Sequence, residues 1–367
     1  MRAGKPFRPS RCRDAPDPRG VARSGLPNRP AVRRPRRFVA GRHARQLAGA
    51  GVSAAAGERP TLLVIVGPTA AGKTAIAEEI ARRFSGEIVS ADAFAVYRGF
   101  DVGTGKPSRE RRSEIRYHLV DAAEPGESFS AGRWAAEARR AIDDIVSRGH
   151  LPIVCGGSGF YVSALLDGLP PGEAKNPALR KALASWASSR GREAAHRFLE
   201  KNDAAAASRI PVRNLRYTLR ALEIVLTTGS RVSERMIRGG PRSAPWRVIK
   251  IVIEPSRRDL YAKIENRVRG MLDAGWDDEV RQLVGSGLSL EANAFGAIGY
   301  REVAGWVSGR AGREETEREI AAATRRLAKR QLTWLARDRE AMRLTPEDAV
   351  PKILQLLGRH GHTEKSG

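Results

Sequence analysis

Short continuous apolar runs alternate with amphipathic stretches along much of the chain. Residues 62–66 (Leu-Leu-Val-Ile-Val) form such a run, which is typical of a parallel strand buried on both faces. Residues 87–90, 151–155 and 247–254 predict three more strands. Apolar positions at helical spacing predict helices after residue 74 and over 131–146. This alternation predicts an α/β fold with a parallel sheet flanked by helices.

The strand pattern is lost between residues 168 and 243. This stretch is rich in Ala, Arg and Leu, and we predict helices over residues 178–189 and 212–226. Pro170-Pro171-Gly172 and Gly239-Gly240-Pro241 bound it. We interpret it as an all-helical insertion in the α/β core. After Pro255 the pattern is helical again, with a helix that ends at Gly275 and a later basic helix that reaches Arg337.

These patterns divide the chain into five parts. We expect a basic disordered arm (1–58), the first part of the core (59–168) and a helical insertion that binds RNA (169–245). The core is then completed with C-terminal helices (246–345), and a last helix and frayed tail follow (346–367). The arm is rich in Pro and Arg and lacks apolar periodicity, so we expect it to be dispensable. An RNA-binding arm and a translation start near residue 58 are the alternatives.

The charge balance suggests the class of partner. Sixty-five Lys and Arg against 41 Asp and Glu give a net charge of +24 over 367 residues. Residues 1–58 carry +11 of this and the remainder carries +13, so the folded body is itself basic. A basic body favours a polyanionic partner, with nucleic acid first and a merely solubilising surface as the alternative.

Cysteine content and hydropathy exclude several classes of protein. Cys12 and Cys155 are the two cysteines, which is too few for a disulfide framework or a Cys-rich zinc module. No run of 18 apolar residues is present, so we expect no membrane span. We therefore expect a cytoplasmic protein.

A glycine-rich phosphate-binding loop follows the first predicted strand and precedes the first helix. It fits G-x-x-x-x-G-K-[ST] and consists of Gly67, Pro68, Thr69, Ala70, Ala71, Gly72, Lys73 and Thr74. Such a loop directs backbone N–H groups at phosphate oxygens, and the helix N-terminus adds partial positive charge. The Lys73 ammonium reaches the terminal phosphates and the Thr74 hydroxyl can ligate Mg²⁺. An ordinary Gly-containing turn is the alternative.

The loop does not identify which phosphate is bound. A nucleotide hydrolase usually has a Mg²⁺-organising Asp after a neighbouring strand, whereas residues 151–155 run into Gly156-Gly157-Ser158-Gly159. Asp92, expected at the end of the strand that begins at Glu87, is the nearest substitute. Its carboxylate suits a general base, a Mg²⁺ organiser or a helix N-cap.

Five stretches in a fixed order resemble the tRNA dimethylallyltransferase (isopentenyl-tRNA transferase) family of bacterial type. They are Gly67–Thr74, Ser90-Ala-Asp-Ala-Phe-Ala-Val-Tyr-Arg-Gly-Phe-Asp-Val-Gly-Thr-Gly-Lys106, Gly156-Gly-Ser-Gly-Phe-Tyr161, Ala297-Ile-Gly-Tyr-Arg-Glu302 and Ala328-Lys-Arg-Gln-Leu-Thr-Trp334. Tyr117-His118-Leu-Val-Asp121 fits between the second and the third. The resemblance spans residues 61 to 337.

The resemblance implies a P-loop NTPase-like fold and a prenyltransferase activity. The dimethylallyl group of dimethylallyl diphosphate passes to N6 of adenosine-37, just 3′ of the tRNA anticodon. The phosphate loop then binds the diphosphate leaving group, which fits the absent Asp after residue 155. The target base must leave its stack to react. Mg²⁺ is the implied cofactor, the anticodon stem-loop is the implied partner, and we expect a monomer.

The resemblance also assigns roles to residues. Asp92 matches the general base, and Thr69 and Ser158 match further catalytic positions. Thr69, Lys73 and Thr74 match diphosphate and Mg²⁺ binders. The implied tRNA contacts are Asp92, Ala93, Phe94, Ala95, Ser158, Asn176, Arg216, Tyr217, Arg220, Arg301, Lys329 and Arg330.

The chain departs from the family pattern at three positions, two of which concern the implied purine contacts. The family commonly has Ser and Gln where this chain has Ala93 and Ala95, and Thr where it has Ser158.

Three other functions stay open from the residues alone: a small-molecule kinase, a non-catalytic RNA-binding protein and an enzyme that prenylates free adenine nucleotides. The long helical insertion argues against the last, because a mononucleotide needs no such surface.

Overall fold

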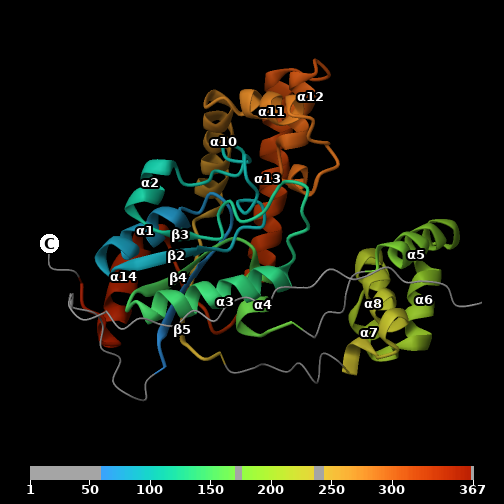
Figure 1. Cartoon of the computed structure of the whole chain (residues 1–367), viewed down its shortest axis with the longest axis horizontal. Helices are drawn as coiled ribbons and strands as arrows, with labels where there is room; N and C mark the ends of the chain where they lie inside the picture. The colour runs from blue at the N-terminus through green and yellow to red at the C-terminus, as the bar shows by residue number, and fades with distance from the viewer. Residues whose placement is uncertain (1–58, 170–175, 235–243, 365–367) are drawn as a thin grey trace, which may run out of the picture. The chain divides into compact units, whose positions relative to one another are not determined.

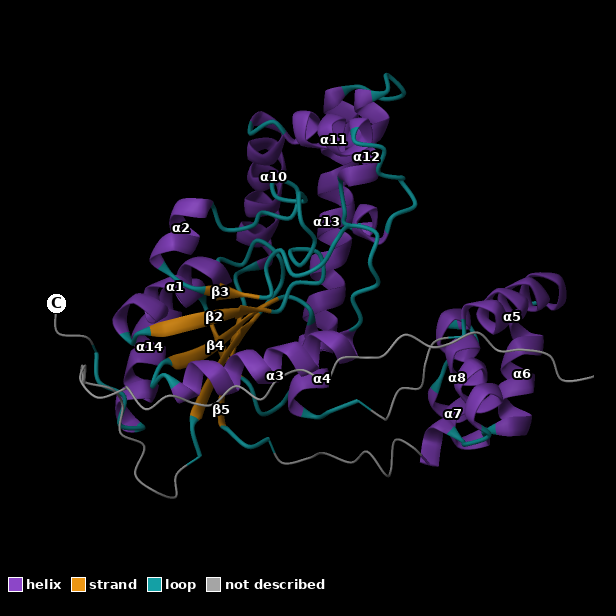
Figure 2. Ribbon diagram, in the orientation of Figure 1, coloured by secondary structure: helices purple, strands orange, loops and turns teal. Residues whose placement is uncertain are grey.

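A six-stranded sheet forms the centre of the fold in this computed structural model, which describes residues 59–169, 176–234 and 244–364. The predicted arm at residues 1–58 lies outside the described residues. The strand order is β3-β2-β4-β1-β5-β6, and every pairing is parallel. Figure 2 draws the sheet in orange between purple helices. The strands are β1 (Thr61–Val66), β2 (Gly86–Ser90), β3 (Tyr117–His118), β4 (Leu151–Gly156), β5 (Arg247–Ile253) and β6 (Met342–Leu344).

The four strands that the apolar runs predict are all present. The two edge strands, β3 and β6, were not predicted, because two or three residues cannot display a period. They exist through their partners: Tyr117 pairs with Ile88 on β2, and Met342 pairs with Ile251 on β5. The α/β fold with a parallel sheet is confirmed.

Helices cover both faces of the sheet. Leu63 and Ile65 of β1 pack with apolar residues of α1 (Lys73–Arg83) and α14 (Pro346–Arg359). Leu62, Val64 and Val66 point to the other face and belong to the cluster that includes α3 (Ala131–Ser147) and α4 (Gly159–Leu166). Figure 1 shows α1 and α14 together and α3 beside α4. Burial of both faces explains why β1 has no polar residue between its ends.

The described part of the core contains several further helices. They are α2 (Arg109–Glu114), α10 (Arg257–Asp273), α11 (Trp276–Gly285), the 3₁₀ turn η1 (Asn293–Gly296), α12 (Tyr300–Val307) and α13 (Arg313–Leu335). Gly275 has a φ of 84°, so it ends the run of α10 as its position predicted. The late basic helix is α13, and it ends at Leu335, so Arg337 lies beyond it.

The insertion consists of helices, as predicted. They are α5 (Pro177–Arg190), α6 (Arg192–Asn202), α7 (Ala204–Arg209) and α8 (Leu215–Thr228). Leu183, Leu199 and Leu222 anchor a small apolar core of their own. Helix α8 begins at Leu215 rather than at residue 212, because Pro211 opens a turn in which the Asn214 N–H donates to the Pro211 carbonyl. No helix in the described ranges is long and apolar enough to cross a bilayer.

Candidate active site

The phosphate loop joins β1 to α1, as its sequence predicts. Ala70 and Gly72 have φ angles of 64° and 84°, which turn the backbone sharply before the helix. No side chain caps the N-terminus of α1, so its first amides are left for an anion. The Lys73 ammonium donates to the Pro68 carbonyl at 2.6 Å, which holds the lysine over the loop. The eight predicted residues therefore form one continuous turn between β1 and α1, with the geometry expected of a phosphate-binding loop.

Lys73 is buried, and its surroundings set its protonation. Burial lowers the pKa of Lys73 to about 8, because the ammonium loses its water. The charge of Arg267 contributes to this lowering, whereas the charge of Asp92 opposes it. The ammonium donates its hydrogen bond to the neutral Pro68 carbonyl, so a bound diphosphate would give it an anionic partner.

Asp92 lies just beyond β2, not in it. The strand ends at Ser90, so the expectation that it continues to Asp92 is wrong. One carboxylate oxygen, Oδ1, accepts the backbone N–H groups of Phe94 at 2.8 Å and Ala95 at 3.2 Å. No helix begins here, so Asp92 caps a turn and is not a helix N-cap. The two hydrogen bonds to Oδ1 fix the orientation of the carboxylate. They leave Oδ2 without a backbone donor among the described residues.

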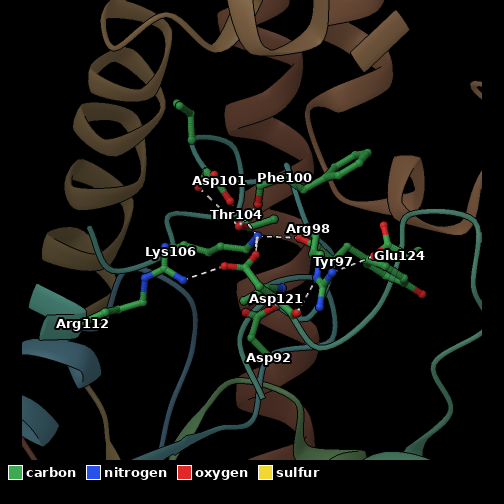
Figure 3. A network of polar contacts seen from close by, with 12 residues as sticks. Asp92, Tyr97, Arg98, Phe100, Asp101, Thr104, Lys106, Arg112, Asp121 and Glu124 are labelled. Atoms are coloured by element: carbon green, nitrogen blue, oxygen red, sulfur yellow. Dashed lines mark hydrogen bonds and ion pairs between the residues drawn. The ribbon is translucent and has the colours of Figure 1, made fainter. Parts of the chain in front are cut away.

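The loop after Asp92 is held by a buried cation, Lys106. Its ammonium, on a side chain that is 2% exposed, binds Asp101 at 2.7 Å and Asp121 at 2.6 Å. It also donates to the Tyr97 carbonyl. Figure 3 shows the Lys106 ammonium in the middle of this network, with Asp92 drawn below Asp121. Burial tends to raise the pKa of Asp121, but the hydrogen bonds from Lys106 and Arg112 outweigh it and hold that pKa below its usual value.

Helix α11 also supports this loop. Its Glu279 accepts the backbone N–H groups of Asp101 at 2.9 Å and Val102 at 2.7 Å. The Tyr300 hydroxyl donates to the second oxygen of Glu279 at 2.6 Å. A side chain at Gly103 would lie 2.2 Å from the ring of Trp276, so only glycine fits there. The loop that carries Asp92 is therefore fastened to α11 and α12.

Ser158 lies in the glycine-rich loop that follows β4. Its N–H donates to the Ala91 carbonyl at 3.1 Å, which ties this loop to the residue before Asp92. Ser158 is at the N-cap position of α4, but its hydroxyl does not cap the helix. Its side-chain oxygen is therefore not engaged by the first turn of α4. Phe160, two residues later, is 63% exposed.

The fold brings together three of the predicted groups. Strands β2, β4 and β1 are neighbours, and their carboxyl ends lead into Asp92, Ser158 and the phosphate loop. Ligands bind at this edge of open parallel sheets. Within the described ranges, no group of three or more His, Cys, Asp or Glu side chains forms a metal site.

Arg267 and Gln331 belong to this region and were not assigned by the sequence. The Arg267 guanidinium donates to the Thr104 carbonyl at 3.3 Å. Its head packs at the turn of Gly105, and desolvation there lowers the pKa of Arg267 while the charge of Asp92 raises it. Gln331 accepts the Thr69 N–H at 2.9 Å. Gln331 lies in the stretch from Ala328 to Trp334 that resembles the family. The sequence placed Arg267 in a predicted helix but did not indicate that it belongs to the site.

The other basic and aromatic residues predicted to contact RNA are mostly exposed. Arg301, Lys329 and Arg330 are exposed on α12 and α13. In the insertion, Arg216 is exposed and Tyr217 is 64% exposed.

Two predicted contacts of the insertion have structural partners. Arg220 forms an ion pair with the buried Glu223 at 2.8 Å. Asn176 caps α5 by accepting the Leu179 N–H at 2.9 Å, and its own N–H donates to Glu223 at 2.9 Å. The side chains of Arg220 and Asn176 therefore stabilise the helical insertion.

Comparison with known proteins places the chain in a family. The model of the family described as IPP transferase matches residues 95–338. The tRNA dimethylallyltransferase of Thermomicrobium roseum is 43% identical over 76% of this chain and 84% of that protein. That of Anaeromyxobacter dehalogenans is 43% identical over 80% of this chain and 95% of its own length.

Comparison with solved structures supports the same family assignment. The full-length tRNA isopentenylpyrophosphate transferase of Bacillus halodurans is similar with a TM-score of 0.60 and 32% identity, over 82% of this chain and 96% of that one. A eukaryotic dimethylallyltransferase acting on tRNA, at a TM-score of 0.71 and 23% identity, supports the fold alone. Matches of this identity and coverage, together with the phosphate loop and the Asp92 turn at one sheet edge, show that this chain belongs to the IPP transferase family of tRNA dimethylallyltransferases.

Proposed function

We propose that this protein transfers the dimethylallyl group of dimethylallyl diphosphate to N6 of adenosine-37 in tRNA. One observation carries the proposal: the phosphate loop after β1, the Ser158 loop after β4 and Asp92 after β2 lie at the carboxyl ends of three neighbouring strands, and the Ser158 N–H donates to the Ala91 carbonyl beside Asp92. A cationic cradle for a leaving diphosphate thus adjoins a carboxylate that has a free oxygen. Family membership supports the same reaction.

Residues of this chain can accept the proton that the transfer releases and can stabilise the negative charge that develops on the diphosphate. The bond between N6 and the first prenyl carbon forms while the carbon–oxygen bond to diphosphate breaks, and the electron pair leaves with the diphosphate. Asp92 accepts the N6 proton at Oδ2, because Oδ1 is already engaged by two backbone N–H groups. Lys73 and Arg267 stabilise the departing charge.

Mg²⁺ fits the phosphate loop through Thr74. This residue is exposed in the first turn of α1, where a hydroxyl oxygen suits an ion that keeps most of its water ligands. Thr74 would hold the ion together with diphosphate oxygens. The bound ion supplies further neutralisation of the leaving group.

The RNA-binding surface is assigned on exposure and charge. Lys329, Arg330 and Arg301 offer phosphate contacts from the core, and Arg216 and Tyr217 offer them from the insertion at residues 169–245. Phe160 offers an exposed ring near Ser158, which suits stacking on an unpaired base. The anticodon stem-loop is the expected partner, a monomer is the expected state, and the cytoplasm, where tRNA is modified, is the expected compartment.

A labelling experiment tests the proposal against its alternatives. The full-length protein is incubated with radiolabelled dimethylallyl diphosphate and Mg²⁺, together with unmodified tRNA, AMP, ADP or ATP. We expect label in tRNA alone, located by mass spectrometry at the base 3′ of the anticodon. Label in a free nucleotide, ATP turnover without label transfer, or tRNA binding without product would each overturn it in favour of one of the other three functions.

A further inference from the structure

The side-chain amide of Gln331 connects two loops that are far apart in the sequence. Its Oε1 accepts the backbone N–H of Thr69 at 2.9 Å, and its Nε2 donates to the Gly157 carbonyl at 2.9 Å. Thr69 lies in the phosphate loop after β1, and Gly157 lies in the loop after the neighbouring strand β4. Gln331 itself comes from the C-terminal part of α13, so three elements meet at one amide group.

The loop after β4 leaves no room for side chains where α13 approaches it. A Cβ atom at Gly157 would lie 2.4 Å from the Nε2 of Gln331. One at Gly159 would lie 2.2 Å from the ring of Trp334, which is one turn further along α13. The two glycines therefore allow the helix to approach until the amide of Gln331 reaches both loops.

The two loops carry opposite halves of the proposed reaction. The phosphate loop holds the prenyl diphosphate. Gly157 precedes Ser158, whose N–H donates to the Ala91 carbonyl, and Ala91 is followed by Asp92. Gln331 therefore spans the boundary between the leaving-group side and the side where the adenine is received.

We propose that Gln331 is a positioning residue that sets the distance between the phosphate loop and the Gly157–Ser158 loop for group transfer. The inference rests on the proposed function. A displacement reaction needs the attacking nitrogen, the prenyl carbon and the leaving oxygen in line, and a misplacement of about 1 Å can cost about 10²-fold in rate. Gln331 suits this task because one planar group supplies both an acceptor and a donor.

Loss of these two bonds leaves the fold intact, because α13 has other anchors. Its Arg325 binds Glu265 of α10 at 2.8 Å, and its Glu317 binds Arg269 at 3.2 Å. Ile320, Ala328 and Leu335 on its inner face are buried in the main apolar cluster. Two neutral hydrogen bonds make only a modest net contribution to folding, because the unfolded chain forms equivalent bonds with water. A purely structural role therefore predicts a small loss of stability and no selective effect on turnover.

Two substitutions separate the acceptor from the donor. In Gln331→Glu one oxygen still accepts the Thr69 N–H, but the second faces the Gly157 carbonyl and repels it. In Gln331→Met both bonds are lost at similar volume. We expect kcat to fall by about 10–10²-fold in both, with the KM for tRNA and for the prenyl diphosphate within about threefold of wild type. Gln355→Glu is the matched control, because Gln355 is exposed on α14 and accepts from Lys352.

A double-mutant cycle keeps the test decisive if one variant folds poorly. Gly157→Ala places a methyl group against the Gln331 amide, so we expect it alone to lower kcat. Its effect and that of Gln331→Met should not add, because both remove the same contact. Additive losses, a wild-type kcat in either Gln331 variant, or a change confined to KM would refute the positioning role. A wild-type protein that labels no tRNA would instead refute the proposed function itself.

Discussion

Lys106 and Asp121 form an ion pair, with 2.6 Å between Nζ and Oδ1, that joins the segment following β2 to the segment following β3. The loop that carries Asp92 is irregular, so hydrogen bonds within a helix or strand do not hold it. A buried cation with several acceptors takes that role. The loop that carries Asp92, the proposed general base, is thus held by a lysine 14 residues further along the chain.

Replacing Lys106 tests how far the loop depends on this cation. Lys106→Met leaves Asp121 with Arg112 and leaves Asp101 without its ammonium partner. We expect a loss of about 2–4 kcal/mol in the free energy of unfolding, measured in urea, together with a reduced kcat. Lys263→Met, at an exposed position of α10, is the control. Equal stability of the two variants would contradict a structural role for the buried cation.

Asp92→Asn and Asp92→Ala separate the two tasks of this carboxylate. Asparagine keeps an oxygen that accepts the N–H groups of Phe94 and Ala95, so the turn is preserved, whereas alanine loses it. Because neither replacement accepts the N6 proton, we expect kcat to fall by about 10²–10⁴-fold in both. Affinity for tRNA, measured by filter binding, should remain in the Asn variant. A wild-type kcat for Asp92→Asn would remove Asp92 as the base.

The pH dependence of prenyl donor binding should report on Lys73. Burial lowers its pKa to about 8 in the free protein, so the ammonium is protonated below pH 8 and neutral above it. Because the neutral amine attracts the diphosphate less strongly, kcat/KM for dimethylallyl diphosphate should fall as the pH rises through about 8. Lys73→Arg retains its charge over this range and should abolish the decline, although it binds the diphosphate with altered geometry. A profile that is flat from pH 7 to 9 in the wild type would contradict this assignment.

Acid stability should depend on Glu87, whose side chain is 5% exposed at the start of β2. Burial raises its pKa, but hydrogen bonds from His118, His150 and Arg148 outweigh this and lower the pKa to about 2. A folded-state pKa below the ordinary value stabilises the fold above about pH 4.5, and this stability is lost as the pH falls toward 2.

Glu87→Gln should therefore cost about 2–4 kcal/mol at neutral pH. It should also flatten the acid limb of a stability curve measured by urea unfolding from pH 7 to 3. Glu347→Gln, at an exposed position of α14, is the control. An unchanged acid limb in the Glu87 variant would show that other groups set the acid sensitivity.

Two arginines of α8 should respond differently to substitution. Arg216 is exposed, whereas Arg220 is paired with the buried Glu223. If Arg216 contacts a tRNA phosphate, Arg216→Ala should reduce the slope of log affinity against log salt by about one, because one fewer counterion is released. Arg220→Ala should instead destabilise the insertion. Identical salt slopes for wild type and Arg216→Ala would exclude this phosphate contact.

Much of the architecture was readable from local patterns. The apolar runs at residues 62–66 and 151–155 predicted buried parallel strands because both faces of those strands are covered. The phosphate loop was recognisable because its chemistry is carried by eight consecutive residues. The edge strands β3 and β6 escaped prediction because their existence depends on β2 and β5 rather than on their own two or three residues.

By itself, the sequence determined the four central strands, the helical insertion and the phosphate-loop motif, and it indicated Asp92 and Ser158 as candidate site residues. Only the tertiary structure decided which residues hold those groups in place. Lys106, Glu279, Arg267 and Gln331 act across separations of up to 262 residues. The physical reason is that a hydrogen bond or ion pair between distant segments leaves no periodic trace in either segment, so it exists only once the chain has folded.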